Sequence, residues 1–347
     1  MIFGQAELHN VEELVPVEGR PGLLLQRVPE AVRLGLLEKG QEQIRRASNI
    51  EIRFGAKESE DIPVILASYG GVSVAQLYYG DYWVEDVLIG EAPTTITLRS
   101  REPMFQFADP WCEKVPRSSF GPIWRIVIQG YEVHLIDIPD GMITLPQKQE
   151  LPARRYLAYG TSITFGISAS TPDLSYVSQT ASRLGLDPIN LGMPGAAFCE
   201  RAIAEYIAER KDWAIASLCL SVNMLNQGVS VEEFKDKARY MVQRIACAHP
   251  NKPLICIGLF PSFADLGWSW PDREVNATSS SYREALRGIV QNCGYARVYY
   301  VDGRDLLDSW QGLSHDLLHP GNSGMIRIGE RLASFMRPLL DVETLRR

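Results

Sequence analysis

The pattern of apolar residues changes near residue 150, and this change constrains the fold more than any other feature of the sequence. Between residues 50 and 138, short β-like runs follow one another with Gly, Pro or charged turns between them. Little room is left for helices, so we predict an antiparallel β-sandwich or jelly roll. Its predicted strands are 50–54, 62–67, 72–79, 94–98, 124–128 and 131–138. One helix, 29–47, is predicted before them, with Pro29 at its start.

After residue 155, strand-like runs alternate with longer amphipathic segments, which is typical of an α/β fold with a parallel sheet. The predicted strands are 156–159, 189–191, 215–221, 254–259 and 298–301. The predicted helices are 176–184, 200–210, 231–249, 281–293 and 324–339. Because 347 residues suit two hydrophobic cores better than one, we expect a β-sandwich domain at 1–150 and an α/β domain at 151–347.

Composition narrows the classes of partner. Hydrophobic residues make up 46% and charged residues 22%, as in ordinary globular proteins. The net charge of −7 provides no general attraction to nucleic acid or to an anionic membrane surface. We therefore expect a small-molecule substrate, no nucleic acid and no membrane partner. The oligomeric state is left open, a homo-oligomer included.

The six cysteines are scattered, without the close spacing of a zinc site. Most of those in the second half, such as Cys219 and Cys256, lie in apolar runs, which favours buried free thiols and a reducing compartment. The N-terminus lacks the pattern of a signal peptide, and no apolar stretch approaches the roughly 20 residues of a membrane span. We predict a cytoplasmic protein without a metal or cofactor.

Ligands of parallel α/β sheets bind beyond the carboxyl ends of the strands, so the loops there come first. They contain Ser162 after the first strand, Gly192 and Gly195 after the second, Asn223 after the third, and the segment Ser314-His315-Asp316-Leu317-Leu318-His319-Pro320 near the end of the chain. Each has an ordinary structural explanation on its own, such as a turn, a positive φ angle or a cap.

Together these residues match the needs of ester hydrolysis. Ser162 can attack a carbonyl, and histidine is the side chain best suited to take its proton at neutral pH, which makes His319 the predicted base. Asp316, three residues earlier, can orient the imidazole. The backbone N–H groups of Ser162 and Gly192, with the side-chain amide of Asn223, are the predicted oxyanion hole.

At this point the sequence resembles the SGNH/GDSL-like hydrolase family. Four blocks occur in the family's order: Gly160-Thr161-Ser162, Asn190-Leu191-Gly192, Ser221-Val222-Asn223 and Asp316-Leu317-Leu318-His319. The resemblance covers about residues 154–340. Thr161, Ser221 and Met224 depart from it, standing where the family usually has Asp, Gly and Asp, but none of the three is a predicted reacting group.

The resemblance implies a serine esterase with a parallel sheet flanked by helices. It implies short acyl groups, acetyl above all, on a carbohydrate or other small alcohol. The N-terminal half is similar to the jelly-roll domain that precedes the catalytic domain in some carbohydrate esterases of this family.

Other interpretations remain. Gly160 to Thr164 nearly forms the nucleophile elbow of an α/β-hydrolase, but Thr164 replaces its last Gly and no strands precede it to build that sheet. His315, Asp316 and His319 have the types and spacing of metal ligands, yet Pro320 disfavours a regular helix there and no companion cluster exists.

Trp268 and Trp270, in the loop 261–278, either pack among the aromatic residues of that loop or line the acyl or sugar pocket. The same triad in an acyltransferase would pass the acyl group to an alcohol acceptor, and the sequence does not separate transfer from hydrolysis. A carbohydrate-binding protein with a vestigial hydrolase domain is a further alternative. The intact set of Ser, Gly, Asn, Asp and His argues against that alternative.

Overall fold

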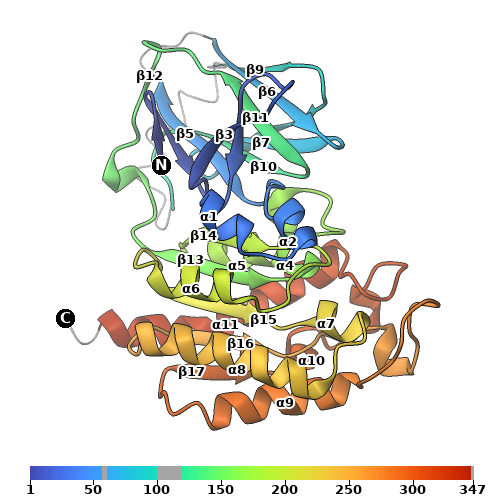
Figure 1. Cartoon of the computed structure of the whole chain (residues 1–347). Helices are drawn as coiled ribbons and strands as arrows, with labels where there is room; N and C mark the ends of the chain where they lie inside the picture. Colours follow the sequence, from blue (N-terminus) through green and yellow to red (C-terminus); the bar gives the residue numbers. More distant parts are fainter. Residues whose placement is uncertain (57–60, 100–118, 345–347) are drawn as a thin grey trace. The chain divides into compact units, whose positions relative to one another are not determined.

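The computed structural model describes residues 1–56, 61–99 and 119–344, so Cys112 lies outside the described residues. Two compact units make up the chain (Figure 1). The first comprises Met1–Glu30, Ile44–Ala153 and Gly185–Asp187, and the second comprises Ala31–Gln43, Arg154–Leu184 and the chain from Pro188 onward. The short segments 31–43 and 185–187 therefore depart from a single division near residue 150.

The first unit consists of two antiparallel sheets that share one core. One sheet has the order β1 (Ile2–Phe3), β2 (Ala6–His9), β5 (Ile50–Ala56), β10 (Trp124–Gln129), β7 (Ser73–Tyr79) and β8 (Tyr82–Ile89), with β12 (Ile143–Thr144) also paired to β5. The other has the order β3 (Glu13–Pro16), β4 (Leu23–Gln26), β11 (Glu132–Asp137), β6 (Ile62–Tyr69) and β9 (Thr94–Leu98). Ile52 and Ile126 of one sheet and Leu66 and Val133 of the other are fully buried in a single cluster. The predicted β-sandwich is confirmed.

The second unit is built on a sheet with the order β14 (Asp187–Gly192), β13 (Arg155–Gly160), β15 (Ile215–Cys219), β16 (Leu254–Ile257) and β17 (Val298–Val301). The pairs from β13 to β17 are parallel, which confirms the predicted α/β fold. Because β14 and β15 flank β13, the loops that follow these three strands meet at one edge of the sheet.

Two groups of helices pack around this sheet (Figure 1). α5 (Tyr176–Leu184) packs against α11 (Asn322–Thr344). α6 (Arg201–Glu209), α8 (Val231–Ala248) and α9 (Ser279–Gln291) lie in a row, α6 against α8 and α8 against α9. Ser230 caps α8 by accepting a hydrogen bond from Glu233 N, as the sequence pattern predicted. None of the described helices combines the length and apolar character required for crossing a membrane.

The predicted helix at 29–47 is wrong, because the structure has two short helices there, α1 (Glu30–Leu34) and α2 (Glu38–Gln43). The break falls at Gly35, where an added Cβ would lie 2.7 Å from the Cβ of Ala202. The side-chain amide of Gln41 donates to the carbonyl oxygen of Leu36 at 2.9 Å. A close approach to α6 and a side chain that satisfies a released carbonyl together favour a turn over a continuous helix.

The five described cysteines are all free. Cys199, Cys219, Cys256 and Cys293 are buried, as predicted, whereas Cys247 is exposed. Burial raises the pKa of the Cys219 thiol to about 12. That thiol is therefore protonated at neutral pH and packs as a small apolar group.

A buried ion cluster joins residues of the first unit. Glu51, which is 1% exposed, receives two hydrogen bonds from Arg125 at 2.8 and 2.9 Å and one from Arg53 at 2.8 Å. Arg53 also pairs with both oxygens of Asp187, at 2.6 and 2.9 Å. Burial alone would raise the pKa of Glu51, but Arg125 and Arg53 hold it well below its usual range. The carboxylate therefore stays ionised although it is buried.

We expect Glu51→Gln to lower the free energy of unfolding by about 3–5 kcal/mol, because it leaves two buried guanidinium groups without their shared countercharge. Chemical denaturation at neutral pH measures this loss. Glu132→Gln is the matched control, since Glu132 pairs with Arg20 and Arg45 near the surface, and its loss should be at most about 1 kcal/mol.

The sign of the pH dependence follows from the lowered pKa. The contribution of Glu51 is complete above the usual glutamate pKa of about 4.3 and is lost as the pH falls toward its folded-state pKa. If Glu51→Gln and Glu132→Gln are equally stable at neutral pH, the ion cluster does not contribute the expected free energy of unfolding.

Candidate active site

Ser162 is the first residue of α4 (Ser162–Phe165), which begins directly after β13. Thr161 is the N-cap, with its side chain accepting from Ile163 N, and Gly166 ends the helix at a φ of 101°. Ser162 is only 6% exposed, and its hydroxyl lies 2.7 Å from Nε2 of His319. A tightly capped turn therefore presents this hydroxyl to the imidazole.

Asp316 holds the other side of the same imidazole. Its Oδ2 lies 2.6 Å from His319 Nδ1, and its Oδ1 accepts from the backbone N–H groups of Leu318 and His319 at 2.9 Å and from the Ser314 hydroxyl at 2.8 Å. Burial alone would raise the pKa of Asp316, but the hydrogen bond from the His319 ring and the three others hold it well below the usual range. The ionised carboxylate fixes a proton on Nδ1, which leaves Nε2 as an acceptor toward Ser162.

The backbone N–H of Gly192, a predicted oxyanion donor, has a partner inside the protein. It donates to Asn190 Oδ1 at 2.9 Å, and Asn190 Nδ2 donates to Thr164 O at 2.8 Å. An added Cβ on Gly192 would lie 2.3 Å from Phe165 N. The structure thus gives Gly192 a packing role, because only glycine lets β14 approach the backbone of α4 this closely.

Gly195 and Asn223 lie in the two neighbouring loops. Gly195 has a φ of 64°, and no acceptor for its N–H is found in the described parts of the chain. Asn223 belongs to α7 (Val222–Asn226), and its Oδ1 accepts from Ala197 N at 3.2 Å, which leaves its NH2 group as the donor. Gln227 further ties the loop by donating to Gly195 O at 3.0 Å. The sequence shows Gly192 and Gly195 after the same strand, but residue type does not reveal which of their two N–H groups already has an acceptor inside the protein.

The loop after β16 carries the two predicted binding tryptophans. Its 3-10 helix η3 (Phe263–Leu266) is bound to the segment that carries Asp316 and His319, since Phe263 N donates to Leu317 O at 2.8 Å. Phe263 also packs edge-to-face on Trp270 at 5.2 Å. Trp268 and Trp270 are 58% and 46% exposed. They line a hollow of about 80 Å³ with Leu225 and Asn226 of α7, but Ser162 and His319 do not line it.

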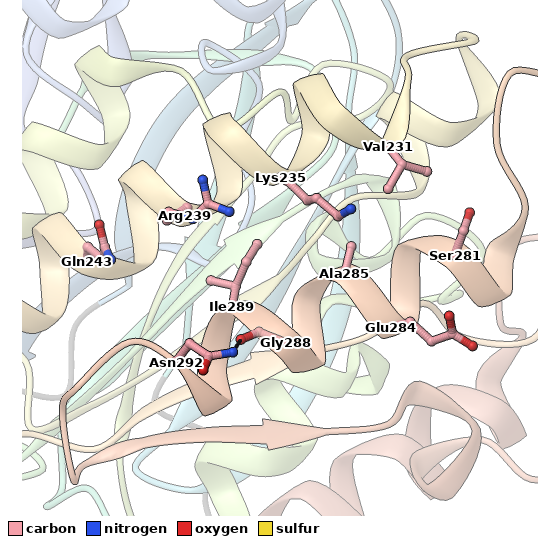
Figure 2. A pocket seen from close by; sticks show the side chains of 10 residues that line it. All are labelled: Val231, Lys235, Arg239, Gln243, Ser281, Glu284, Ala285, Gly288, Ile289 and Asn292. Atoms are coloured by element: carbon pink, nitrogen blue, oxygen red, sulfur yellow. Dashed lines mark hydrogen bonds between the residues drawn. The ribbon is translucent and has the colours of Figure 1, made fainter.

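The remaining sequence candidates lie elsewhere. Both ring nitrogens of His319 are engaged, and no group of three or more potential metal ligands is found among the described residues. His134 and His249 bond to the backbone carbonyls of Pro21 and Ala208, as expected of structural histidines. A hollow of about 440 Å³ lies between α8 and α9. It is bordered by charged side chains such as Lys235, Arg239 and Glu284 (Figure 2). No predicted site residue lines it.

The model of the GDSL-like Lipase/Acylhydrolase family matches residues 153–337 of this chain. No curated protein matches the sequence.

Solved structures resemble the whole chain at low sequence identity. The salicylyl-acyltransferase SsfX3 from a tetracycline biosynthetic pathway is 17% identical, with a TM-score of 0.74 over 96% of this chain and 95% of its own. A family two carbohydrate esterase from Clostridium thermocellum in complex with cellohexaose is 14% identical, with a TM-score of 0.59 over 85% and 94%. The acetyl xylan esterase Est2A from the rumen bacterium Butyrivibrio proteoclasticus is 12% identical, with a TM-score of 0.57 over 97% and 99%. At these identities the likeness shows a shared fold.

The contacts among Ser162, His319 and Asp316 predict how substitutions affect ester turnover. Ser162→Ala and His319→Ala should each lower kcat for p-nitrophenyl acetate by at least about 10⁴-fold, because a nucleophile and its base act as a unit. Asp316→Asn should cost up to about 10⁴-fold, since it removes the charge that stabilises the imidazolium. Initial rates on folded variants, checked by circular dichroism, measure these losses.

His315→Ala is the matched control, because it removes the imidazole next to Asp316 in sequence without touching either contact of His319. It should retain most activity. An inactive His315→Ala beside an active His319→Ala would mean that the base has been assigned to the wrong histidine.

Proposed function

The chain belongs to the GDSL-like lipase/acylhydrolase family, and we propose that it hydrolyses esters of short acyl groups through a covalent acyl-enzyme on Ser162. One observation carries this proposal. The Ser162 hydroxyl, the His319 imidazole and the Asp316 carboxylate form an unbroken line of hydrogen bonds, with distances of 2.7 and 2.6 Å. This arrangement supplies a nucleophile, a base and an orienting charge without any movement of the chain.

In the proposed reaction, Ser162 Oγ bonds to the ester carbonyl carbon as its proton passes to His319 Nε2. The C=O π bond opens to a tetrahedral oxyanion, and Asp316 stabilises the imidazolium. His319 then returns the proton to the leaving alkoxide, the C–O bond breaks, and the acyl group remains on Ser162. Water, deprotonated by the same imidazole, then attacks the acyl carbon. The bond from that carbon to Ser162 Oγ breaks, His319 returns the proton to Ser162 Oγ, and the carboxylic acid leaves.

We assign the oxyanion contacts to the N–H groups of Ser162 and Gly195 and to the side-chain amide of Asn223. Gly195 replaces the expected Gly192 because the Gly192 N–H is committed to Asn190, whereas no acceptor for the Gly195 N–H lies in the described residues. Ala197, two residues after Gly195, orients the Asn223 amide by donating to its oxygen. Preorganised donors of this kind need no rearrangement as charge develops on the carbonyl oxygen.

The proposed substrates are acetyl or other short acyl esters of a carbohydrate or small alcohol. The acetyl xylan esterase and the carbohydrate esterase share this fold, and Trp268 and Trp270 offer exposed aromatic faces on which a sugar ring can stack. A second outcome, transfer of the acyl group to an alcohol acceptor, uses the same acyl-enzyme and is favoured by the likeness to the acyltransferase along nearly the full chain. The free thiols favour a cytoplasmic site of action. Nucleic acid and membrane lipid are not proposed partners.

Acyl chain length tests the substrate class. We expect a higher kcat/KM for an acetyl ester than for a twelve-carbon ester of the same alcohol, because an acetyl xylan esterase shares this fold along nearly the full chain. A series of p-nitrophenyl esters measures the preference, and product analysis with an added sugar or alcohol separates hydrolysis from transfer. Faster turnover of the twelve-carbon ester would overturn the short-acyl proposal.

The proposed role of Trp268 and Trp270 in binding the sugar is tested with acetyl esters of different alcohols. Trp268→Ala and Trp270→Ala should raise KM for an acetylated glycoside by about fivefold, as expected for loss of roughly 1 kcal/mol of ring stacking, while kcat for methyl acetate stays unchanged. Trp310→Ala is the matched control, since Trp310 is likewise exposed, at 40%, but lies outside the loop 261–278. An unchanged KM in both loop variants would remove these residues from the binding site.

A further inference from the structure

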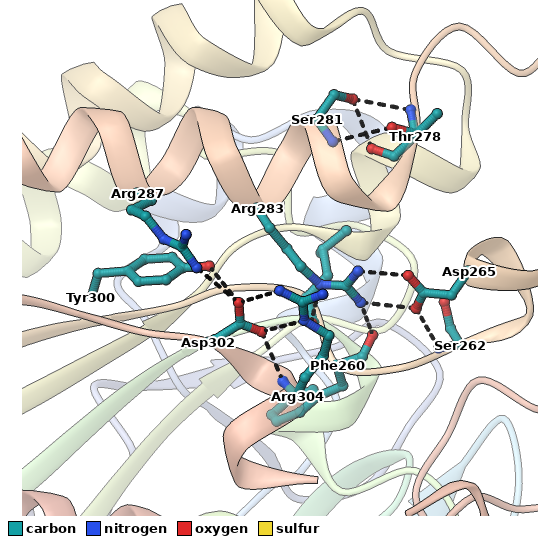
Figure 3. Close-up of polar contacts among 11 residues, drawn as sticks. Phe260, Ser262, Asp265, Thr278, Ser281, Arg283, Arg287, Tyr300, Asp302 and Arg304 are labelled. Carbon is teal, nitrogen blue, oxygen red and sulfur yellow. Dashed lines mark hydrogen bonds and ion pairs between the residues drawn. The ribbon is translucent and has the colours of Figure 1, made fainter. Parts of the chain in front are cut away.

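Arg283 of α9 is a buried arginine whose donors all point to one segment of chain. It is 2% exposed, and its Nη1 and Nη2 donate to the two carboxylate oxygens of Asp265 at 2.6 and 2.8 Å. Its Nε donates to Leu259 O at 2.9 Å and its Nη2 also to Phe260 O at 3.2 Å (Figure 3). One planar guanidinium therefore binds three residues of the segment 259–266, which follows β16.

Asp265, which pairs with Arg283, is in turn hydrogen-bonded to the backbone of the segment. Its Oδ2 accepts from Ser262 N at 3.1 Å, and its own N–H donates to Ser262 O at 2.8 Å, so that η3 is closed by a capping box. Phe263, the residue after Ser262, donates its N–H to Leu317 O at 2.8 Å. Leu317 has a φ of 51°, in the left-handed region that a branched side chain rarely adopts. This hydrogen bond therefore acts on a strained residue directly beside Asp316.

We propose that Arg283 is a positioning residue for the esterase reaction. Together with Asp265 it fixes the segment 259–266, and through the bond from Phe263 N to Leu317 O it fixes the loop that presents Asp316 and His319 to Ser162. This inference rests on the proposed function, because it assigns Arg283 to the geometry of that site. Arg283 itself contacts none of the three reacting side chains.

A purely structural role, in which Arg283 only anchors α9, makes a different demand on the side chain. For that role a buried positive charge next to Asp265 is sufficient, so lysine should substitute. Positioning of the segment needs the planar fork that binds Asp265 and two carbonyl oxygens at once, which lysine cannot reproduce. Arg287, one turn later on α9, offers a matched control, because it pairs with Asp302 at 3.1 Å and forms no hydrogen bond or ion pair with 259–266 among the described residues (Figure 3).

The test compares Arg283→Lys, the double variant Arg283→Met/Asp265→Asn and the control Arg287→Met. The double variant removes both charges, because either single loss would leave a buried charge unpaired and endanger folding. Thermal unfolding verifies each fold. The readouts are kcat and KM for an acetyl ester, and hydrogen exchange of peptides covering 259–266 and 313–320.

We expect Arg283→Lys and the double variant to lower kcat by about 10- to 100-fold with KM changed less than about threefold, since small displacements of a base cost this much. Both should speed hydrogen exchange in 313–320. Arg287→Met should leave kcat and that exchange as in the wild type. Wild-type exchange in 313–320 in either folded Arg283 variant would overturn the proposal, and so would wild-type kcat.

The exchange measurement needs no substrate. A failure of the esterase proposal itself, seen as turnover that survives Ser162→Ala, is therefore recognised separately from a failure of the positioning role.

Discussion

The carboxylate of Asp316 is the acceptor around which the site is organised. Its two oxygens take four hydrogen bonds, three from its own loop and one from the His319 ring. The backbone bonds wrap the loop around the charge, and the strained φ of Leu317 is one consequence of that tight path. The same charge fixes the tautomer of the imidazole that faces Ser162. One ionised group thus sets both the shape of the loop and its chemistry, and depends on neighbouring segments to hold the loop in place.

The sequence predicts the second unit in more detail than the first. Strands β13 to β17 are short apolar runs between amphipathic helices, so that alternation alone places them, and α5 begins and ends where predicted. In the first unit, β1 to β4, β8 and β12 were not predicted. Their residues are exposed on both faces or form runs of two to four residues, and pairing partners distant in sequence decide such strands. The helix at 29–47 failed because contact of Gly35 with Ala202, invisible in a local pattern, favours a turn.

In the candidate site, too, local sequence identifies some residues and only tertiary contacts identify the others. Ser162, Asp316 and His319 were identifiable because each follows a strand or belongs to a block of known order, and the structure places them within hydrogen-bond distance. The choice between Gly192 and Gly195 was not identifiable, because it depends on where the Asn190 side chain turns its oxygen. Arg283 gave no signal at all, since an arginine in an amphipathic helix is expected at the surface and only the tertiary fold buries it.

Both ends of the loop that carries Trp268 and Trp270 are fastened to the same helix. Arg283 of α9 holds segment 259–266 at one end, and at the other Thr278 and Ser281 form the capping box that starts α9. The residues between these two ends are 267–277, and all of them except Ala277 are exposed. The contacts that position His319 do not come from this stretch. Insertions, deletions and substitutions in this stretch can therefore change the substrate without moving Ser162, His319 or Asp316.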